Sequence, residues 1–285
     1  MTAYPSAETD RGTLVLADAR LGAAQLDGES VDLAFFGPPY NSASLGATGN
    51  EEIRSASDYC EWMSALFAEL ARVLKPDGSV VIELGLSWQP GAKVRAHDGI
   101  QFLAQLLSRG DWLLVQDFYH YTPDFREQRA DLVVDPRIRL KSSVTTLWWL
   151  SRSPDVTADY RDVADYGNSL TGIGSNLVTV HESSMDYEFV ESSEGASHRD
   201  RMPLNAARFF IQLLTTTDQV VLDPFAGFGT TPVACELLGR RWRGFEHDEA
   251  RFEEAARRLD AFGARYLSGR REAQGDRPDG GVGAS

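Results

Sequence analysis

The feature that most constrains the fold is a strand, a glycine turn, a helix and a second strand in immediate succession. They occupy the segment QVVLDPFAGFGTTPVACELLGRRWRGFEHDE, residues 219–249. The first strand is aliphatic and stops at Asp223-Pro224, as a buried parallel strand does. The glycines at 227 and 229 let the backbone turn and approach a ligand closely. Such a unit is typical of nucleotide and nucleoside sites in open α/β sheets.

The second strand of this unit ends in an acidic residue, Glu246, about 20 residues beyond the glycine turn, where a carboxylate binds ribose hydroxyls. The segment lacks the Lys that follows the glycines of a phosphate-binding P-loop, and Pro232 replaces the last glycine of the dinucleotide pattern G-x-G-x-x-G. The predicted ligand is therefore a nucleoside without a phosphate chain. The alternative, on the pattern alone, is a tight turn that binds nothing.

A second apolar strand stops abruptly at two prolines, in the sequence DLAFFGPPY, residues 32–40. Neither proline can donate a hydrogen bond to a sheet. Each proline also holds the residue before it in an extended conformation, which fixes the direction of the carbonyl groups. Tyr40 adds an aromatic face. In isolation this pattern would indicate only a Pro-Pro turn.

The two motifs together resemble those of DNA methyltransferases that modify exocyclic amino groups. DPFAGFGTT followed by GRRWRGFEHDEARFEEAARRL resembles the S-adenosylmethionine motif, and Gly37-Pro38-Pro39-Tyr40 resembles the catalytic tetrapeptide. The tetrapeptide comes first, which is the order of the family's beta class. Three further segments, DFYHYTP, RIRLKSSVTTLWWLSRSP and HRDRMPLNAARFFIQLLT, are similar to the branch that methylates cytosine at N4. The similarity covers most of residues 13–265 and leaves out 154–197.

Strand and helix patterns alternate along the chain, which favours a mostly parallel α/β sheet. Asp58, with Glu61 three positions on, is expected to cap a helix that continues to Leu74. The resemblance implies a Rossmann-like methyltransferase fold with a mostly parallel seven-stranded sheet. It also implies circular permutation, with the catalytic half of the domain before the cofactor half.

The expected organisation has five parts. In order they are a flexible N-terminal arm (1–12), the catalytic half (13–153), a target-recognition insertion (154–197), the cofactor half (198–267) and a disordered tail (268–285). The insertion is rich in acidic residues, Ser and Gly, and a solvated linker is the alternative interpretation for much of it.

The resemblance also implies roles for individual residues. Catalysis would rest on Gly37, Pro38, Pro39 and Tyr40, with Tyr40 facing a base pulled out of the double helix. The residues expected to bind S-adenosylmethionine are Asp18, Asp223, Phe225, Gly227, Gly229, Thr230, Thr231 and Glu246. The residues expected to contact DNA are Arg126, Arg137, Arg139, Lys141, His198 and Arg201. Asp18 follows a predicted strand, and its alternative role is a helix cap.

Gly37 departs from the family pattern, in which Ser, Asp or Asn precedes the two prolines. Because glycine has no side-chain acceptor, the amino group must be polarised by backbone carbonyls or by a group from elsewhere. This position therefore leaves cytosine N4 and adenine N6 both open, and the segments DFY and TTLWWLSRS favour cytosine. Methylation at cytosine C5 is disfavoured, because its cysteine nucleophile follows a proline, whereas Cys60 follows Tyr59 and Cys235 follows Ala234.

The formal net charge of -14 argues against a protein that coats nucleic acid indiscriminately. A DNA enzyme with this charge must concentrate its basic residues locally, as residues 126–152 do. The acidity keeps open the methylation of RNA, of a protein amide or of a small amine. A different class, a catalytically weakened binding module, is disfavoured by the intact DPFAGFGTT.

The remaining expectations concern metals, partners and location. The two cysteines are far apart, so no metal site is expected. No apolar run reaches the roughly 20 residues of a membrane span and the N-terminus lacks the features of a signal peptide, so a cytoplasmic location is expected. The expected partners are double-stranded DNA and a cognate restriction endonuclease, and the expected state is a monomer or a homodimer.

Overall fold

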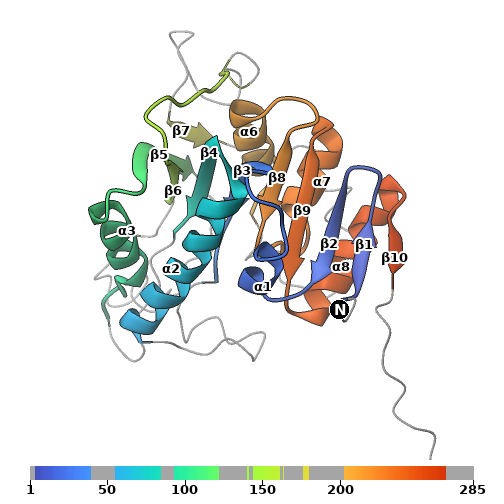
Figure 1. Ribbon diagram of the computed structural model, residues 1–285, viewed down its shortest axis with the longest axis horizontal. Coiled ribbons are helices and arrows are strands. Elements are labelled where there is room, and N and C mark those ends of the chain that lie inside the picture. The colour runs from blue at the N-terminus through green and yellow to red at the C-terminus, as the bar shows by residue number, and fades with distance from the viewer. Residues whose placement is uncertain are drawn as a thin grey trace, which may run out of the picture.

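One sheet of ten strands forms the centre of the computed structural model (Figure 1). The structure describes residues 4–39, 55–84, 93–121, 140, 144–160, 163, 176–179 and 202–267. The strands are β1 (Ser6–Glu8), β2 (Gly12–Leu16), β3 (Val31–Phe36), β4 (Leu74–Glu83), β5 (Leu113–Tyr121), β6 (Val144–Ser151), β7 (Leu177–Thr179), β8 (Val220–Asp223), β9 (Arg241–Glu246) and β10 (Arg265–Leu267). Their order across the sheet is β10-β1-β2-β9-β8-β3-β4-β6-β5-β7.

The prediction of seven strands is corrected by this sheet of ten. From β2 to β4 all neighbouring strands are parallel, and β6 is antiparallel to both β4 and β5, which makes the sheet mixed. Three of the ten strands, β1, β7 and β10, are only three residues long and lie near an edge of the sheet. Strands of this length are too short to show a recognisable hydrophobic period.

β1 also corrects the expected flexible arm at residues 1–12. Ser6–Glu8 pair antiparallel with β2 on one side and with β10 on the other, so this stretch is an ordered part of the sheet. The expected disordered tail, 268–285, lies outside the described residues. Much of the expected insertion at 154–197 does too, although β7 within it pairs with β5.

Helices cover both faces of the sheet (Figure 1). The helices are α1 (Ala19–Ala23), α2 (Ala56–Val73), α3 (Asp98–Ser108), α6 (Leu204–Leu214), α7 (Thr230–Leu238) and α8 (Glu249–Leu259), followed by the 3-10 turn η4 (Asp260–Phe262). Side chains of β3 alternate between the two faces. Leu33 and Phe35 join the core under α6, α7 and α8, whereas Ala34 and Phe36 join the core under α2 and α3.

The order of the sheet reverses between β3 and β8. From β8 the chain runs through α7 to β9 on one side, and from β3 it runs through α2 to β4 on the other. The two strands are parallel, with Leu33 opposite Val221 and Ala34 opposite Leu222. Their carboxyl ends therefore lie at the same edge, the lower edge in Figure 1. Open α/β sheets bind ligands at such a reversal, because the connections diverge there.

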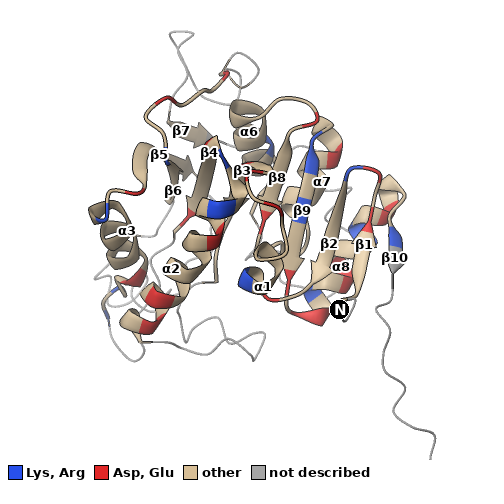
Figure 2. Cartoon of the chain, viewed as in Figure 1, with Lys and Arg blue, Asp and Glu red and all other residues tan. Residues whose placement is uncertain are grey.

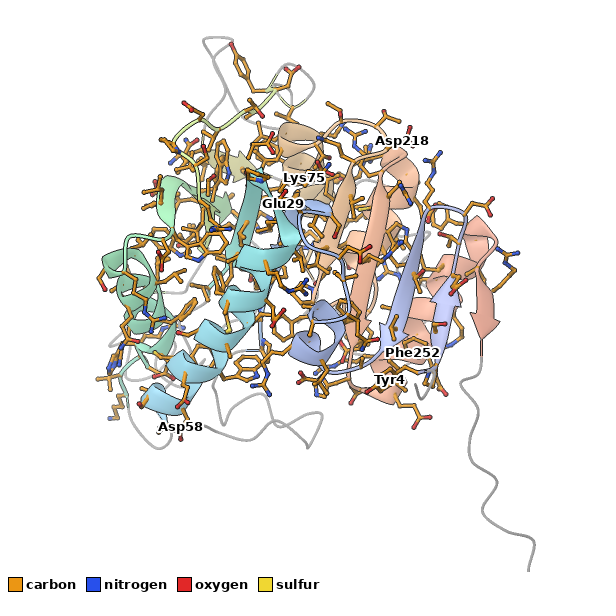
Figure 3. All side chains as sticks on the ribbon, viewed as in Figure 1. Tyr4, Glu29, Asp58, Lys75, Asp218 and Phe252 are labelled. Carbon is orange, nitrogen blue, oxygen red and sulfur yellow. The ribbon has the colours of Figure 1, made fainter. Side chains whose placement is uncertain are left out.

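The amino ends of these strands are joined at the opposite edge by one buried carboxylate. Asp32 is 8% exposed and accepts hydrogen bonds from Lys75 Nζ at 2.7 Å, Gln219 Nε2 at 3.1 Å and the Val220 amide at 2.8 Å. Figure 3 shows Lys75 at the upper edge of the sheet, away from the start of α2 at Asp58. The carboxylate of Asp32 therefore fixes β3 relative to β4 and β8.

Candidate functional site

The two sequence motifs meet where β3 and β8 end. Residues 37–39 directly follow β3, and Asp223 is the last residue of β8. The ring of Phe225 lies against Phe36, with centroids 5.7 Å apart, and against Trp62 of α2, with centroids 5.5 Å apart. These contacts bring the Gly-Pro-Pro segment next to the segment that opens the glycine turn.

The glycine turn uses its two glycines for different purposes. Gly227 and Gly229 both have positive φ, 53° and 79°, which a residue with a side chain adopts only with strain. A Cβ on Gly229 would stand 3.0 Å from the Cβ of Ala255, so this glycine is required for the packing of α8. A Cβ on Gly227 would have as its nearest neighbour the carbonyl oxygen of Phe225 at 3.8 Å. Gly227 therefore leaves room for a ligand at the turn.

Glu246 connects the glycine turn to the end of β9. Its side chain is buried, and Oε2 accepts a hydrogen bond from the Gly227 amide at 2.8 Å. Oε1 accepts from the Asp248 amide at 2.8 Å and lies 3.3 Å from Nδ1 of His247. A hydrogen bond between the side chains of His247 and Glu246 is the main reason that the pKa of His247 is raised. Because each carboxylate oxygen has two lone pairs, Oε2 keeps one for a ligand hydroxyl.

Asp223 is a second buried carboxylate at this edge. Oδ1 accepts from the Phe225 amide at 3.0 Å, and Thr231 also hydrogen-bonds the side chain. The pKa of Asp223 is raised to about 7, chiefly because burial disfavours the charged form. The charge of Glu246 acts in the same direction, while the bonds from Thr231 and Phe225 oppose it. Within the described ranges neither carboxylate forms an ion pair with Lys or Arg. A cationic ligand would therefore stabilise both.

A helix follows the glycine turn directly, as the sequence predicted. Thr230 and Thr231 are its first residues, both are buried, and Gly229 is the N-cap. The amino end of α7 is thus at the glycine turn, and its partial positive charge lies beside Asp223. Figure 2 shows acidic residues around the same edge, at the end of β9 and the start of α8.

Asp18 lies one strand away from Glu246, since Leu16 pairs with Glu246 in the sheet. Its Oδ1 accepts hydrogen bonds from the amides of Arg20 at 2.9 Å and Leu21 at 3.2 Å, which caps α1. The structure thus gives Asp18 the role of helix cap, the alternative that the sequence left open. Contact with the cofactor stays a prediction for this residue.

The described residues do not include the whole of the predicted site. Of the catalytic tetrapeptide, Gly37 is exposed, Pro38 is buried and Pro39 is half-buried, and Tyr40 lies outside the described residues. The predicted DNA contacts also lie outside them: Arg126, Arg137, Arg139, Lys141, His198 and Arg201. The roles of these residues stay predictions.

One carboxylate at this edge was missed by sequence reasoning. Glu83 is the last residue of β4, and because Phe36 pairs with Ile82, Glu83 comes level with Gly37. A Cβ added to Gly37 would stand 3.7 Å from the Cβ of Glu83. The available signal was an acidic residue in an otherwise apolar stretch, residues 79–84. This signal could not be interpreted, because the sequence alone does not show that β4 is the neighbour of β3.

The described part of the chain holds no group of three or more His, Cys, Asp or Glu side chains placed to bind a metal ion. Nor does it contain a helix with the length and apolar character needed to cross a membrane.

Residues 31–257 match the N6/N4 methyltransferase family, described as DNA methylase. The chain is 26% identical over 277 residues to the Type II methyltransferase M.PvuII of Proteus hauseri, a match that covers 85% of this chain and 82% of that protein. A solved structure of PvuII DNA methyltransferase, described as cytosine-N4-specific, matches with a TM-score of 0.74 and 26% identity, covering 88% of this chain and 87% of that one. The M1.HpyAVI-SAM complex matches at 19% identity and a TM-score of 0.57, covering 87% and 99%, and supports the fold alone.

Proposed function

Because the chain belongs to the N6/N4 DNA methylase family, we propose that it transfers a methyl group from S-adenosylmethionine to the N4 amino group of cytosine in duplex DNA. The observation that carries the proposal is the contact between Phe36 and Phe225, which brings the Gly-Pro-Pro segment and the glycine turn together. The choice of cytosine rests on the segments DFY and TTLWWLSRS and on the similarity to M.PvuII. Adenine N6 is the alternative target, since the family includes both.

The residues around the glycine turn fit S-adenosylmethionine, the cofactor of the family. When bound, this cofactor supplies an electrophilic methyl group on a positively charged sulfur. Oε2 of Glu246 has a lone pair for a ribose hydroxyl, and Gly227 leaves space for the ligand. The buried carboxylates of Asp223 and Glu246 favour a cation. We assign further contacts to Asp18, Phe225, Gly229, Thr230 and Thr231.

The residues after β3 would prepare the target base. The lone pair of an exocyclic amino nitrogen is delocalised into the ring, so the nitrogen is a poor nucleophile until acceptors for its hydrogens favour a tetrahedral geometry. The carbonyls of Gly37 and Pro38 are candidates, because each following proline restricts their direction. Tyr40 would stack on the flipped base. Holding the nitrogen in line with the methyl group then permits direct displacement.

The proposed order of the domain is a circular permutation of the Rossmann-like methyltransferase fold. The strand that leads to the Gly-Pro-Pro segment, β3, precedes the cofactor strand, β8, in the chain. Residues 154–197 would read the DNA sequence, and Arg126, Arg137, Arg139, Lys141, His198 and Arg201 would contact DNA. The Arg and Lys side chains of this set are positively charged, and His198 is positively charged when protonated. Positive charge is what binding to phosphates requires.

We further propose a cellular role from the same similarity. The relative M.PvuII is named a Type II methyltransferase. A cognate restriction endonuclease is therefore the expected functional partner, and the cytoplasm, where bacterial DNA lies, is the expected place of action. The protein would work as a monomer or a homodimer.

The direct test uses S-adenosylmethionine with a labelled methyl group, offered with duplex DNA or with RNA. Label is expected in DNA, and label confined to RNA would contradict the proposal. Glu246→Ala should abolish labelling through loss of cofactor binding, because it removes the acceptor at the turn. Glu253→Ala is the matched control, since Glu253 is an exposed residue of α8. If both variants keep full activity, the assigned cofactor site is wrong.

A further inference from the structure

The Gly-Pro-Pro segment contains no side chain that can accept a proton. Gly37 has no side chain at all, and the two prolines offer only backbone carbonyls. Carbonyl oxygens can orient the amino group, but an amide oxygen is far too weakly basic to hold a proton at neutral pH. Methyl transfer to an amino nitrogen leaves that nitrogen with a positive charge. The nitrogen must then lose a proton, and a base close to Gly37 would accept it.

Glu83 is a carboxylate that the fold places beside this position. Strand β4 lies directly beside β3, and their pairing runs to Phe36 opposite Ile82, one residue before Gly37 and Glu83. Side chains alternate along each strand, and Ile82 shares a core with Phe36. Gly37 and Glu83 therefore both belong to the other face. The distance of 3.7 Å between Glu83 Cβ and the position of a Cβ on Gly37 agrees with this.

Glu83 sits on a rigid part of the sheet. Its strand is paired with β3 on one side and with β6 on the other, where Glu83 is opposite Leu147. The next residue, Leu84, donates its amide to the Thr146 carbonyl at 3.3 Å. The side chain is half-buried, so it is held by the structure and still borders solvent. Catalytic groups on strands are held more precisely than groups on loops.

We propose that Glu83 is the catalytic carboxylate of this enzyme and takes the place of a side chain at position 37. The proposal rests on the proposed function, amino methylation at this edge. The amino nitrogen forms its new bond to the methyl carbon as the carbon–sulfur bond breaks and its electron pair stays on sulfur. One of the two original amino hydrogens then leaves as a proton to the Glu83 carboxylate. The products are a neutral thioether, a neutral methylated amine and a neutral carboxylic acid, which returns its proton to water.

The same geometry explains why a glycine can stand at position 37. Any side chain there would begin in van der Waals contact with the stem of Glu83 and would occupy the space next to it. Without that side chain, the space is available to the carboxylate of Glu83. Gly37 and Glu83 thus form a complementary pair, in which β4 supplies the acid group that β3 lacks.

The first experiment replaces Glu83 with Gln, which keeps the size and removes the base. General-base catalysis contributes about 10²- to 10⁴-fold, so kcat for DNA methylation should fall by at least about 100-fold. Affinity for S-adenosylmethionine should stay close to that of the wild type, because Glu83 does not belong to the glycine turn. Glu69→Gln, at a site on α2 that pairs with Arg72, is the control and should leave kcat unchanged.

The decisive experiment moves the carboxylate from β4 to β3. Glu83→Ala should be nearly inactive, and Gly37→Asp added to it should restore a substantial part of kcat, because the two Cβ positions are adjacent. A merely structural role of Glu83 would not be rescued in this way. The pH profile of wild-type kcat gives a further readout that needs no variant. It should fall on the acid side as a carboxylate is protonated.

Two outcomes would overturn the role of Glu83. The first is a kcat of Glu83→Gln equal to that of the wild type, and the second is a flat acid side of the wild-type pH profile. Both leave the proposed function standing, since the wild type would still methylate DNA. Failure of the wild type to methylate any DNA would instead refute the proposed function.

Discussion

Substituting Gly229 with Ala tests how the glycine turn and α8 are built together. Gly229 has φ 79°, and a Cβ there would stand 3.0 Å from Ala255 Cβ and 3.3 Å from its Cα. Gly110 has nearly the same φ, 80°, but its Cβ would meet nothing within 4 Å. The left-handed conformation costs an alanine roughly 1–2 kcal/mol at either site. Only at Gly229 does overpacking add about 1–3 kcal/mol, because backbone atoms of α8 must move.

The free energy of unfolding should therefore fall by roughly 2–5 kcal/mol in Gly229→Ala and by about 1–2 kcal/mol in Gly110→Ala. Urea unfolding followed by tryptophan fluorescence measures both values. Titration with S-adenosylmethionine should show weaker binding for Gly229→Ala and unchanged binding for Gly110→Ala. Equal losses of stability in the two variants, or equal affinities, would refute the account of how α8 supports the turn.

Three further perturbations follow from the buried carboxylates. Burial raises the pKa of Asp223 to about 7, so its contribution to stability is complete below the ordinary pKa of 3.8 and is lost as pH rises through about 7. Between pH 3.8 and about 7, the melting temperature of the wild type should fall more steeply with pH than that of Asp223→Asn. Parallel curves would contradict the raised pKa. Affinity for the cationic cofactor should increase as pH rises through about 7, where Asp223 ionises in the folded protein, and calorimetry can measure this; a pH-independent affinity would argue against Asp223 at the site. Asp32→Asn should lower the free energy of unfolding by about 1–3 kcal/mol, because at least one of its three donors loses its acceptor. A loss near zero in urea unfolding would show that Asp32 does not hold the strands. Glu246→Gln should weaken cofactor binding more than it lowers stability, since the amide keeps one oxygen for the Gly227 amide; unchanged affinity would exclude Glu246 as a ligand.

The elements with a strong local pattern could be predicted closely from the sequence. β3 covers 31–36 and ends just before the two prolines, and α7 follows the glycine turn directly, from Thr230 to Leu238, as expected. The start of α2 was predicted less well. Ser55 is the N-cap and accepts from the Asp58 amide at 3.1 Å, so Asp58 lies inside the first turn and is not the cap. Both residues are good caps, and the sequence alone does not decide between them.

The parts that could not be predicted depend on contacts between distant segments. The three-residue strands β1, β7 and β10 form because longer strands offer them an edge, and their own residues show no period. Asp32 reads as an ordinary residue of a predicted strand, yet it joins β3 to Gln219 across 187 positions. Glu83 becomes a candidate for catalysis only once β4 is known to be the neighbour of β3.

Mass spectrometry of methylated DNA tests the central claim most directly. Duplex DNA is incubated with the protein and S-adenosylmethionine that carries a deuterated methyl group, then digested to nucleosides. The deuterated methyl should appear on N4 of deoxycytidine. Its appearance only on N6 of deoxyadenosine or only on C5 of deoxycytidine would contradict the proposed target, and its absence from every nucleoside would contradict the enzyme itself.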